Sequence, residues 1–551
     1  MASTVRKMLV TYALPYANGP LHLGHMTGLI QADIWARFQK MQGHDCLFVC
    51  GADSHGTPIM IQAEKSGVTP EALTETIRTG HKEDLAGFQI GVDNYHTTHS
   101  PENKALCESI FLAHQKAGNI LQKSIHQAYD PEKNMFLPDR LIRGICPRCS
   151  AEDQYGDGCE VCGAIYSPLD LKNPRSTLSG ATPTQKESVH YFFKLTAFAE
   201  FLKKWTHEKG HLQAEVTHKL DEWFEAGLKE WDISRDAPYF GFLIPRETQK
   251  YFYCWLDAPI GYMASCKNFC DQHPEYSFDF YWKKDSTAEL YHFIGKDIIY
   301  FHALFWPAVL AGAGYRTPTT IFTHGFLTIN GQKMSKSRGT FILAKTFREH
   351  IRPEYLRYYL ATRLASRIED IDINFGDFEQ RIHSDLVGKF VNIASRSAKF
   401  IHANFGGKLA DSLSEPELFK SLATAGQPVS QKMDALEFSD AIRDIMALAD
   451  QVNQYIDSQK PWVVIRDPER QQEAHGICSM GIQLFRQLMV YLKPILPDIA
   501  KNAEIFLNCE PLCWADSQKP LPGGHSISEF KPLAERIPKE QISMLKVKDG
   551  E

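Results

Sequence analysis

Short continuous apolar runs and helically spaced apolar positions alternate over the first 117 residues. Residues 9–14 and 46–50 are short apolar, β-prone stretches, which are typical of strands buried on both faces. Between them, apolar side chains recur every three or four residues from His22 to Met41 and predict an amphipathic helix. This alternation predicts a parallel sheet with helices on both of its faces.

The alternating pattern breaks from about Gly118 to Leu178, where glycine, proline and cysteine dominate. This composition indicates a small module inserted into the α/β domain. Strand and helix patterns resume from about Val189 and include apolar runs at Leu290–Ile294 and Thr320–Phe322. We therefore expect a gap of only about 60–70 residues, mostly module, between the two halves of the sheet.

Beyond about Asn374 the apolar positions take helical spacing only. Ile382, Leu386 and Phe390 are four residues apart, and the stretches Met433–Ile456 and Ile477–Tyr491 continue the same period. This pattern predicts a helix bundle of about 140 residues. A proline- and glycine-rich linker then leads to a tail that contains one short predicted helix.

The predicted architecture is therefore a Rossmann-like, doubly wound α/β fold with an inserted zinc-knuckle module and a C-terminal α-helical bundle. The expected segments are 1–117 and 181–325 for the two sheet halves, 118–180 for the module, 326–377 for a basic loop and junction, 378–518 for the bundle and 519–551 for the linker and tail.

Composition excludes several classes of protein. The 551 residues are 43% hydrophobic and 23% charged, as in ordinary globular proteins of two to four domains. No apolar run approaches the roughly 18 residues that a membrane span needs, and the short run after Lys7 ends in Pro15 with no small-residue cleavage site. The net charge of −6 means that any RNA-binding surface must be a local patch. We expect a cytoplasmic protein with no membrane partner.

Four of the thirteen cysteines are clustered: Cys146, Cys149, Cys159 and Cys162. Two CxxC pairs nine residues apart suit one tetrahedral Zn²⁺ held by four thiolates, whereas disulfides would need an oxidising compartment for which the sequence gives no sign. Four protein ligands leave no open coordination position, so this zinc is expected to be structural.

The motif His22-Leu23-Gly24-His25 follows the first predicted strand and a turn. Both histidines are expected in the first helical turn, where unpaired backbone N–H groups and two imidazoles form an anion site. Gly24 leaves room for a flat ring against the backbone. The alternative is a pair of ordinary helix histidines.

A second motif, Lys333-Met334-Ser335-Lys336-Ser337, forms a basic stretch between two glycines. Taken alone it is equally consistent with a solvated charged loop. A mobile cationic loop that closes on a triphosphate is a common catalytic device. The two motifs together predict an enzyme that binds ATP from two sides and transfers its nucleotidyl group.

These two motifs resemble the hallmark motifs of class I aminoacyl-tRNA synthetases. The resemblance extends over nearly the whole chain to the methionyl-tRNA synthetase family, in its bacterial form with one zinc. The matching segments are Ala13–Gly19, Gly51–Pro58, Trp231–Arg235, Trp255–Tyr262 and Phe293–Asp297.

The resemblance implies a methionine–tRNA ligase used in protein synthesis. L-Methionine would react with ATP, accompanied by Mg²⁺, to give methionyl-adenylate and pyrophosphate. The methionyl group would then pass to the 3′ end of tRNA(Met), both initiator and elongator.

The resemblance also implies the site residues. His22, His25, Lys333 and Lys336 would be catalytic, and Gly24, Gly295, Asp297, Ser335, Ser337 and Lys336 would bind ATP. Methionine would contact Leu14, Tyr16, Asp53, Trp255, Ala258, Pro259, Tyr262, Ile298 and His302, with Asp53 holding the ammonium group. Arg235, Trp231, Phe301 and Phe305 would order the site. Without the family, Asp53 would be an ordinary helix N-cap and the aromatic residues would be core.

Three residues of the predicted bundle match the family's readers of the CAU anticodon: Asn392, Arg396 and Trp462. An exposed indole can stack on an unpaired base, and Asn and Arg side chains can read base edges. The alternative is Pro–Trp packing beside a solvated charged face.

Two other functions stay open from the sequence. One is another class I synthetase, such as the cysteine type, and the other is an inactive tRNA-binding relative. The short gap between the sheet halves leaves no room for an editing domain, which argues against the isoleucine, valine and leucine enzymes. A C-terminal dimerisation domain is missing, so a monomer is expected, and by resemblance the tail should pack back on the catalytic half.

Overall fold

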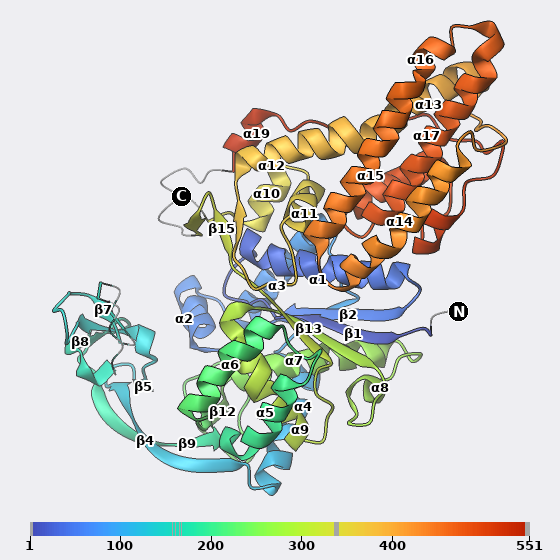
Figure 1. The fold of residues 1–551 in the computed structure, drawn as a ribbon. Helices are drawn as coiled ribbons and strands as arrows, with labels where there is room; N and C mark the ends of the chain where they lie inside the picture. Colours follow the sequence, from blue (N-terminus) through green and yellow to red (C-terminus); the bar gives the residue numbers. More distant parts are fainter. Residues whose placement is uncertain are drawn as a thin grey trace.

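A parallel sheet of five strands, in the order β14-β13-β1-β2-β3, lies at the centre of the molecule (Figure 1). The computed structural model describes residues 4–156, 158–159, 161–162, 164, 166, 168–334 and 341–545. The strands are β1 (Lys7–Tyr12), β2 (Asp45–Ala52), β3 (Asn94–Thr97), β13 (Glu289–Gly295) and β14 (Thr320–His324). The predicted parallel sheet is confirmed, and each of the four apolar runs contributes to one of its strands.

Both faces of this sheet are buried, because successive side chains of a strand point to opposite sides. Met8 and Val10 face a core that contains α1, whereas Leu9 faces a second core with α7 and α9. Figure 1 shows α1 and α3 on one side of the sheet and α4, α7 and α9 on the other. The helices are α1 (Leu23–Met41), α2 (Thr57–Ser66), α3 (Pro70–Gly87), α4 (Pro101–Lys116), α7 (Cys254–Gln272), α8 (Phe278–Trp282) and α9 (Trp306–Gly312).

The strand order reverses between β1 and β13, because β1 lies between β13 and β2. Open α/β sheets bind ligands at the carboxyl ends of the strands beside such a reversal. The His22–His25 motif follows β1 and the Gly295–Asp297 segment follows β13. The fold therefore brings these two segments to one crevice.

The expectation that the sheet resumes near Val189 is wrong. Val189 belongs to β9 (Thr184–Phe193), which pairs antiparallel with β4 (Ile120–Asp130) as a long hairpin. Within the described residues, no strand joins the parallel sheet between β3 and β13. The segment between the sheet halves is therefore much longer than the 60–70 residues expected. The expectation failed because a strand of a hairpin and a strand of the central sheet have the same local sequence pattern.

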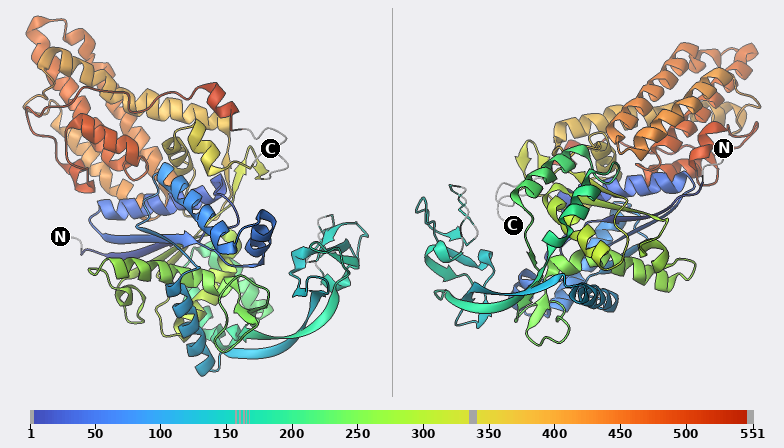
Figure 2. Two further views of the ribbon diagram at one scale, coloured as in Figure 1. Left: turned by 180° about the vertical axis from the view of Figure 1, so that it is seen from behind. Right: turned by 60° about the horizontal axis from the view of Figure 1, so that its bottom comes forward.

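The hairpin forms an arm that carries the cysteine module. Figure 2 shows this small module at the end of the curved arm, away from the central sheet. It contains the three-stranded sheet β7-β6-β8. Its strands are β6 (Ile142–Ile145), β7 (Gln154–Tyr155) and β8 (Lys172–Ser176), and β5 (Met135–Phe136) pairs with β4.

The arm returns to the sheet through several short elements. β10 pairs with β9, and β11 pairs with β12. A second small sheet, β16-β15-β17, precedes the C-terminal helices. These elements are α5 (Ala199–His207), α6 (Ala214–Ala226), β10 (Trp231–Asp232), β11 (Ser234–Asp236), β12 (Lys250–Phe252), β15 (Leu327–Ile329), β16 (Gln332–Lys333), α10 (Ala344–His350), α11 (Pro353–Ala361) and β17 (Ile371–Ile373).

A helix bundle follows, as predicted. Its helices are α12 (Phe375–Arg381), the π-helical η7 (Ile382–Val391), α13 (Asn392–Phe405), α14 (Pro416–Asp434), α15 (Phe438–Gln459), α16 (Pro461–Val464), α17 (Gln471–Leu492) and α18 (Pro497–Leu507). The stretch Met433–Ile456 is interrupted, because Leu436 adopts a left-handed backbone (φ 63°) between α14 and α15. The tail contains α19 (Lys539–Ser543), and its backbone accepts hydrogen bonds from Arg352 and Tyr355 beside α11.

One hydrophobic core runs from the α1 face of the sheet into the bundle. Trp35 Nε1 of α1 donates to the carbonyl of Asp434 (3.0 Å), so α1 belongs to the sheet and also contacts the bundle. No helix in the described parts of the chain is both long and apolar enough to cross a membrane.

Candidate active site

A cavity of about 1100 Å³ opens at the carboxyl ends of β1 and β13. It brings together residues that are up to about 310 positions apart in the sequence. All nine predicted methionine contacts line it: Leu14, Tyr16, Asp53, Trp255, Ala258, Pro259, Tyr262, Ile298 and His302. The other predicted site residues in its lining are His22, Gly24, His25, Arg235, Gly295, Asp297 and Phe301.

His22 lies one position before α1 rather than inside its first turn. Its backbone is extended (φ −125°, ψ 169°), and its side chain caps the helix. The N–H groups of Leu23, Gly24 and His25 donate to Ile342 O, His22 Nδ1 and His22 O. The prediction of unpaired backbone donors at this helix end is therefore wrong, because the first histidine and the neighbouring chain already occupy them.

The two imidazoles supply donors instead. Gly24 N–H donates to His22 Nδ1 (3.1 Å) and His22 N–H donates to His25 Nδ1 (3.3 Å). Burial lowers the pKa of His22 to about 4 and holds the pKa of His25 well below its usual value. A neutral ring whose Nδ1 accepts must carry its hydrogen on Nε2. Each ring therefore presents one Nε2–H donor, and the rings are stacked 3.7 Å apart.

Gly24 is required by close packing. A Cβ atom at this position would lie 2.8 Å from Met334 Cε and 2.9 Å from the His22 ring. Met334 is the second residue of the KMSKS motif, so the start of this motif contacts the His22–His25 turn. The Lys333 backbone belongs to β16, while Ser335, Lys336 and Ser337 lie outside the described residues.

Asp53 follows β2 and faces the cavity with an incomplete set of partners. Its Oδ1 atom is buried without a hydrogen-bond partner in the described chain. Burial and the neighbouring Asp257 raise the pKa of Asp53 well above its usual value, while a backbone hydrogen bond from His55 opposes the shift. A buried carboxylate in this state is matched by a cation such as an ammonium group.

The apolar wall of the cavity comes from α7 and from the π-helical turn η5 (Phe301–Phe305). Trp255, 36% exposed, packs on Phe301 with ring centroids 5.0 Å apart. Trp231 and Phe305 do not line the cavity, but each contacts Phe301 at 5.0–5.4 Å. The four aromatic side chains therefore form one connected layer.

Tyr262 and His302, which both line the cavity, form a hydrogen bond with each other. His302 Nδ1 lies 3.1 Å from the Ile298 carbonyl, which can only accept, so Nδ1 carries the hydrogen. Tyr262 Oη donates to His302 Nε2 at 2.8 Å. Burial lowers the pKa of His302 to about 4, so this pair is uncharged near pH 7.

Gly295 and Asp297 line the cavity after β13. A Cβ on Gly295 would lie 2.6 Å from Asp297 Oδ1, so a side chain there would displace this carboxylate from its present position.

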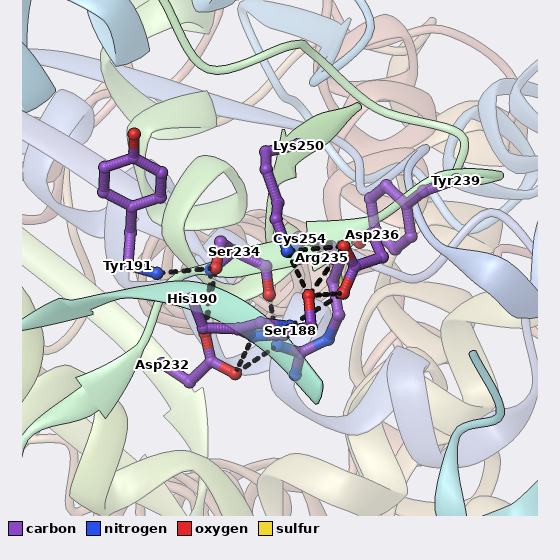
Figure 3. Close-up of polar contacts among 10 residues, drawn as sticks. All are labelled: Ser188, His190, Tyr191, Asp232, Ser234, Arg235, Asp236, Tyr239, Lys250 and Cys254. Atoms are coloured by element: carbon purple, nitrogen blue, oxygen red, sulfur yellow. Dashed lines mark hydrogen bonds and ion pairs between the residues drawn. The ribbon is translucent and has the colours of Figure 1, made fainter. Parts of the chain in front are cut away.

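Arg235 lies on the floor of the cavity. Its guanidinium stacks 3.5 Å above the Tyr253 ring and donates to Asp232 Oδ2 at 3.2 Å. Figure 3 shows Arg235 within a cluster of charged side chains around His190 and Asp236. The expected pairing of Arg235 with an acidic neighbour is therefore present.

The cavity contains side chains that sequence reasoning did not identify. Asp232, Asp236, Tyr239 and Cys254 lie beside the recognised segments and line it. Gln127 and residues 136–139 reach it from the arm. No sequence signal places the arm there, because its curvature is a tertiary feature.

The four clustered cysteines form a possible metal centre in the arm module. Their sulfur atoms lie within 4.8 Å of one another. The Cys146–Cys162 and Cys149–Cys159 sulfur distances are 3.8 and 3.5 Å, close to the roughly 3.8 Å edge of a tetrahedral Zn–thiolate site. Backbone N–H groups of Arg148, Cys149 and Cys162 donate to these sulfurs at 3.4–3.5 Å. The donor set therefore fits a zinc ion.

The predicted anticodon residues meet on the bundle. The Arg396 guanidinium lies 4.6 Å above the Trp462 ring and forms an ion pair with Asp457. Asn392 is one turn earlier on α13. Trp462 is only partly exposed, because Arg396 covers one face of its ring.

Comparisons with known proteins agree with this fold. The family model of class I tRNA synthetases (M) matches residues 8–398, and the anticodon binding domain of methionyl tRNA ligase matches residues 406–548. The fold is similar to Mycobacterium tuberculosis methionyl-tRNA synthetase in complex with methionyl-adenylate (TM-score 0.80, 23% identity, 97% of this chain and 100% of that chain). A free-state structure of that enzyme from the same organism is similar with a TM-score of 0.74 and 21% identity, over 97% of this chain and 98% of that chain.

The first family model alone covers well over half of the chain, and the second covers most of the rest. The chain therefore belongs to the methionine (M) family of class I tRNA synthetases, the methionine–tRNA ligases.

Proposed function

We propose that the described cavity is where this ligase joins methionine to AMP. One observation carries the proposal. A buried carboxylate oxygen of Asp53 without a partner and two neutral Nε2–H donors, from His22 and His25, line one cavity with an aromatic wall. These groups match the ammonium, the phosphate and the thioether side chain of the reactants.

In the first step a methionine carboxylate oxygen attacks the α-phosphorus of ATP, and the bond to pyrophosphate breaks. His22 and His25 donate from Nε2 to the phosphate oxygens where negative charge develops. Because both rings are neutral, they act as hydrogen-bond donors without a proton transfer. We assign Lys333 and Lys336, with Ser335 and Ser337, to the β- and γ-phosphates, and Gly24, Gly295 and Asp297 to the nucleoside.

Asp53 and the aromatic residues hold the amino acid during this step. The ammonium group pairs with the Asp53 carboxylate, and the side chain lies among Leu14, Tyr16, Trp255, Ala258, Pro259, Ile298 and the Tyr262–His302 pair. Because the Tyr262 hydroxyl donates its hydrogen to His302, this pair presents an uncharged surface to the methionine thioether.

In the second step a hydroxyl at the 3′ end of tRNA(Met), initiator or elongator, attacks the carbonyl of methionyl-adenylate and AMP leaves. Asn392, Arg396 and Trp462 read the anticodon at the other end of the tRNA.

We place this reaction in the cytoplasm, where it serves protein synthesis. We also expect the protein to be a monomer, which sedimentation measurements can test.

Two metals belong to the proposal. Mg²⁺ would enter with ATP and supply charge neutralisation at the phosphates. In the described chain, the four clustered cysteines are the only group of three or more candidate metal ligands. Zn²⁺ bound by Cys146, Cys149, Cys159 and Cys162 would stabilise the module without taking part in the reaction. Elemental analysis should find one zinc per chain and none in a Cys149→Ser/Cys162→Ser variant that still catalyses adenylation.

We keep the predicted segments as a working division of the chain: 1–117, 118–180, 181–325, 326–377, 378–518 and 519–551. In it, the arm module interrupts the catalytic part, and the bundle carries the anticodon site. The two family-model matches, 8–398 and 406–548, support a division of the chain into a catalytic part and an anticodon part.

Methionine-dependent exchange of pyrophosphate into ATP tests this assignment. Lys336→Ala should slow the exchange by about 10²–10³-fold while methionine binding persists, since Lys336 acts on phosphates only. Near-normal exchange in this variant would refute its role. Cysteine as a better substrate than methionine would favour the cysteine-type alternative, and no exchange with any of the twenty amino acids would favour an inactive relative.

A further inference from the structure

His190 lies in the middle of a charged cluster beneath the active-site cavity. It belongs to β9, the returning strand of the arm, and its side chain is fully buried. Its Nδ1 atom lies 2.7 Å from Asp232 Oδ2 and its Nε2 atom lies 2.9 Å from Asp236 Oδ2. Figure 3 shows the ring bridging these two carboxylates.

Both carboxylates also accept hydrogen bonds from other donors. Asp236 accepts from Ser188 and pairs with Lys250, and although burial opposes ionisation, these contacts and His190 lower its pKa. Asp232 accepts from Arg235 at 3.2 Å and from the backbone of Ser234 at 3.0 Å. A carboxylate can only accept, so both ring nitrogens of His190 must carry hydrogens.

The two acceptors therefore favour the imidazolium form of the His190 ring. Burial opposes its charge, but the hydrogen bonds to Asp232 and Asp236 outweigh burial and raise the pKa of His190. Other charged groups nearby are already paired: Lys250 with Asp236, Arg235 with Asp232, and Lys123, on the strand opposite, with Glu230.

Asp232 and Asp236 enclose Arg235 in the sequence, and all three line the cavity. The bridging ring fixes both ends of this five-residue segment at once. Arg235 is further held by its hydrogen bond to Ser234 O (2.6 Å) and by the Tyr253 ring. The position of Arg235 in the cavity therefore depends on a residue of the arm.

We propose that His190 is a positioning residue for adenylation: its doubly bonded imidazolium ties the arm to the Asp232–Asp236 segment and so directs Arg235 into the cavity. This inference rests on the proposed function of that cavity. Three cations, His190, Lys250 and Arg235, face two carboxylates, so the cluster carries one excess positive charge beside the cavity. Loss of the His190 proton removes that charge and breaks one of the two bridges.

The proposal predicts alkaline inactivation. A histidine whose pKa is raised in the folded protein stabilises the fold below its usual value of 6.5, and this contribution is lost as the pH rises through the folded value. The kcat for pyrophosphate exchange in the natural protein should therefore decline as His190 deprotonates.

His190→Gln is the direct test, because glutamine is uncharged and carries both of its N–H donors on one nitrogen, so it cannot reproduce a bridge made by two ring nitrogens. Misplacement of an active-site group by about 1 Å costs on the order of 10²-fold in rate. We expect kcat for exchange to fall roughly 10- to 100-fold, KM for methionine to change less than about 3-fold, and the alkaline decline to disappear. The matched control is His126→Gln, an exposed histidine on the paired strand of the same arm, which should leave both kcat and the pH profile unchanged.

A measurement on the unaltered protein keeps the test independent of folding. ¹⁵N-histidine NMR, with the His190 signal assigned by its absence in His190→Gln, should show this ring with both nitrogens protonated and a pKa above 6.5, and Asp236→Asn should lower that pKa. A His190 pKa at or below 6.5 would overturn the proposal, as would a His190→Gln variant with natural kcat and pH profile. If the natural protein lacked methionine-dependent exchange, the proposed function would fail, while the NMR signature would still report the charge of His190.

Discussion

Asp53 has a buried carboxylate oxygen that accepts no hydrogen bond from any group in the described chain. The neighbouring Asp257 is fully buried as well, and burial raises its pKa well above the usual value. Its one side-chain partner is His55, whose Nδ1 lies 3.0 Å from Asp257 Oδ2. Two carboxyl groups share this site, and the one that faces the cavity is the one without a side-chain partner. A substrate ammonium group can supply the positive charge and the hydrogen bond that the Asp53 carboxylate lacks.

Asp53→Asn should therefore weaken methionine binding while ATP binding is retained. The loss of a hydrogen bond to a charged group costs about 1.5–3 kcal/mol, so KM for methionine should rise roughly 10- to 100-fold. Pyrophosphate exchange at varied methionine and ATP measures both constants. Asp271→Asn, an exposed position at the far end of α7, is the control and should leave both constants unchanged.

Methionine binding should also release a proton from Asp53. Because the pKa of this carboxyl is raised in the free protein and the ammonium favours its anion, KM for methionine should increase as the pH falls. Calorimetry in buffers of different ionisation enthalpy measures the release, which Asp53→Asn should abolish. Equal proton release by both proteins would remove Asp53 from the ammonium site.

The residues of the cavity differ in how far they could be predicted. Seven of the nine predicted methionine contacts lie within the matching segments, Ile298 and His302 follow the last of them, and all nine line the cavity. His190 could not be found in this way, because a single histidine in a strand gives no local signal. Its significance arises only when Asp232 and Asp236 pack against β9.

At the scale of elements, α1 shows how capping changes the chemistry of a helix end. An anion site was expected from its free N–H groups, but His22 caps the helix and the adjacent chain binds Leu23 N–H. The proposed phosphate donors are therefore side-chain Nε2–H groups rather than backbone amides. Sequence spacing predicted the helix but could not show which residue caps it, because boundaries depend on backbone dihedrals.

The arm shows a second limit of local patterns. β9 was expected to resume the central sheet, but it pairs with β4 along the hairpin. Alternating burial along a strand predicts that a strand exists and does not name its partner. The bundle was predicted more accurately, since helical spacing over several turns is a stronger signal.

The α13–α16 corner of the bundle leads to a prediction about tRNA. Stacking of a base on an aromatic ring contributes about 1–3 kcal/mol. Trp462→Ala should therefore raise KM for tRNA roughly 5- to 100-fold and leave pyrophosphate exchange unaltered. Aminoacylation at varied tRNA concentration measures the first quantity.

Ile505→Ala, a 63% exposed apolar position on α18, is the control for this prediction and should change neither constant. Arg396 now covers one face of Trp462, so a base must use the other face or displace the guanidinium. Equal losses of adenylation and aminoacylation in Trp462→Ala would mean that the indole only supports the fold.

At the scale of the whole molecule, one buried ion pair joins α1 of the catalytic part to α11, which in turn contacts the bundle. Arg357 Nη2 lies 2.6 Å from Asp33 Oδ2, and both side chains are fully or almost fully buried. Arg357 also donates to Ile495 O (2.8 Å) and Pro494 O (3.0 Å), between α17 and α18. Asp33 lies on α1, whose first turn contains His25. The helix next to the proposed phosphate donors is thus held to the bundle through Arg357.

Arg357→Met should weaken this connection strongly. Removal of one partner from a buried ion pair costs about 3–5 kcal/mol, whereas an exposed pair contributes about 0–1 kcal/mol. Arg443→Met, which removes the exposed partner of Asp440 on α15, is therefore the matched control. Urea unfolding should show the large loss in the first variant only. Since one core runs through sheet and bundle, the natural protein should unfold in a single calorimetric transition, which Arg357→Met should separate into two.

The decline of the free energy of unfolding at acidic pH provides a second test of the same prediction. Burial alone would raise the pKa of Asp33, but Arg37, Arg357 and the Gly91 N–H outweigh it and lower the pKa. Its contribution to stability is present above the unfolded value of 3.8 and is lost as the pH falls through the folded value. Without Arg357 the folded pKa rises, so that loss should begin at a higher pH than in the natural protein. A variant with one transition, a loss below about 1 kcal/mol and an unchanged decline at acidic pH would show that the sheet and the bundle are held together by their apolar contacts alone.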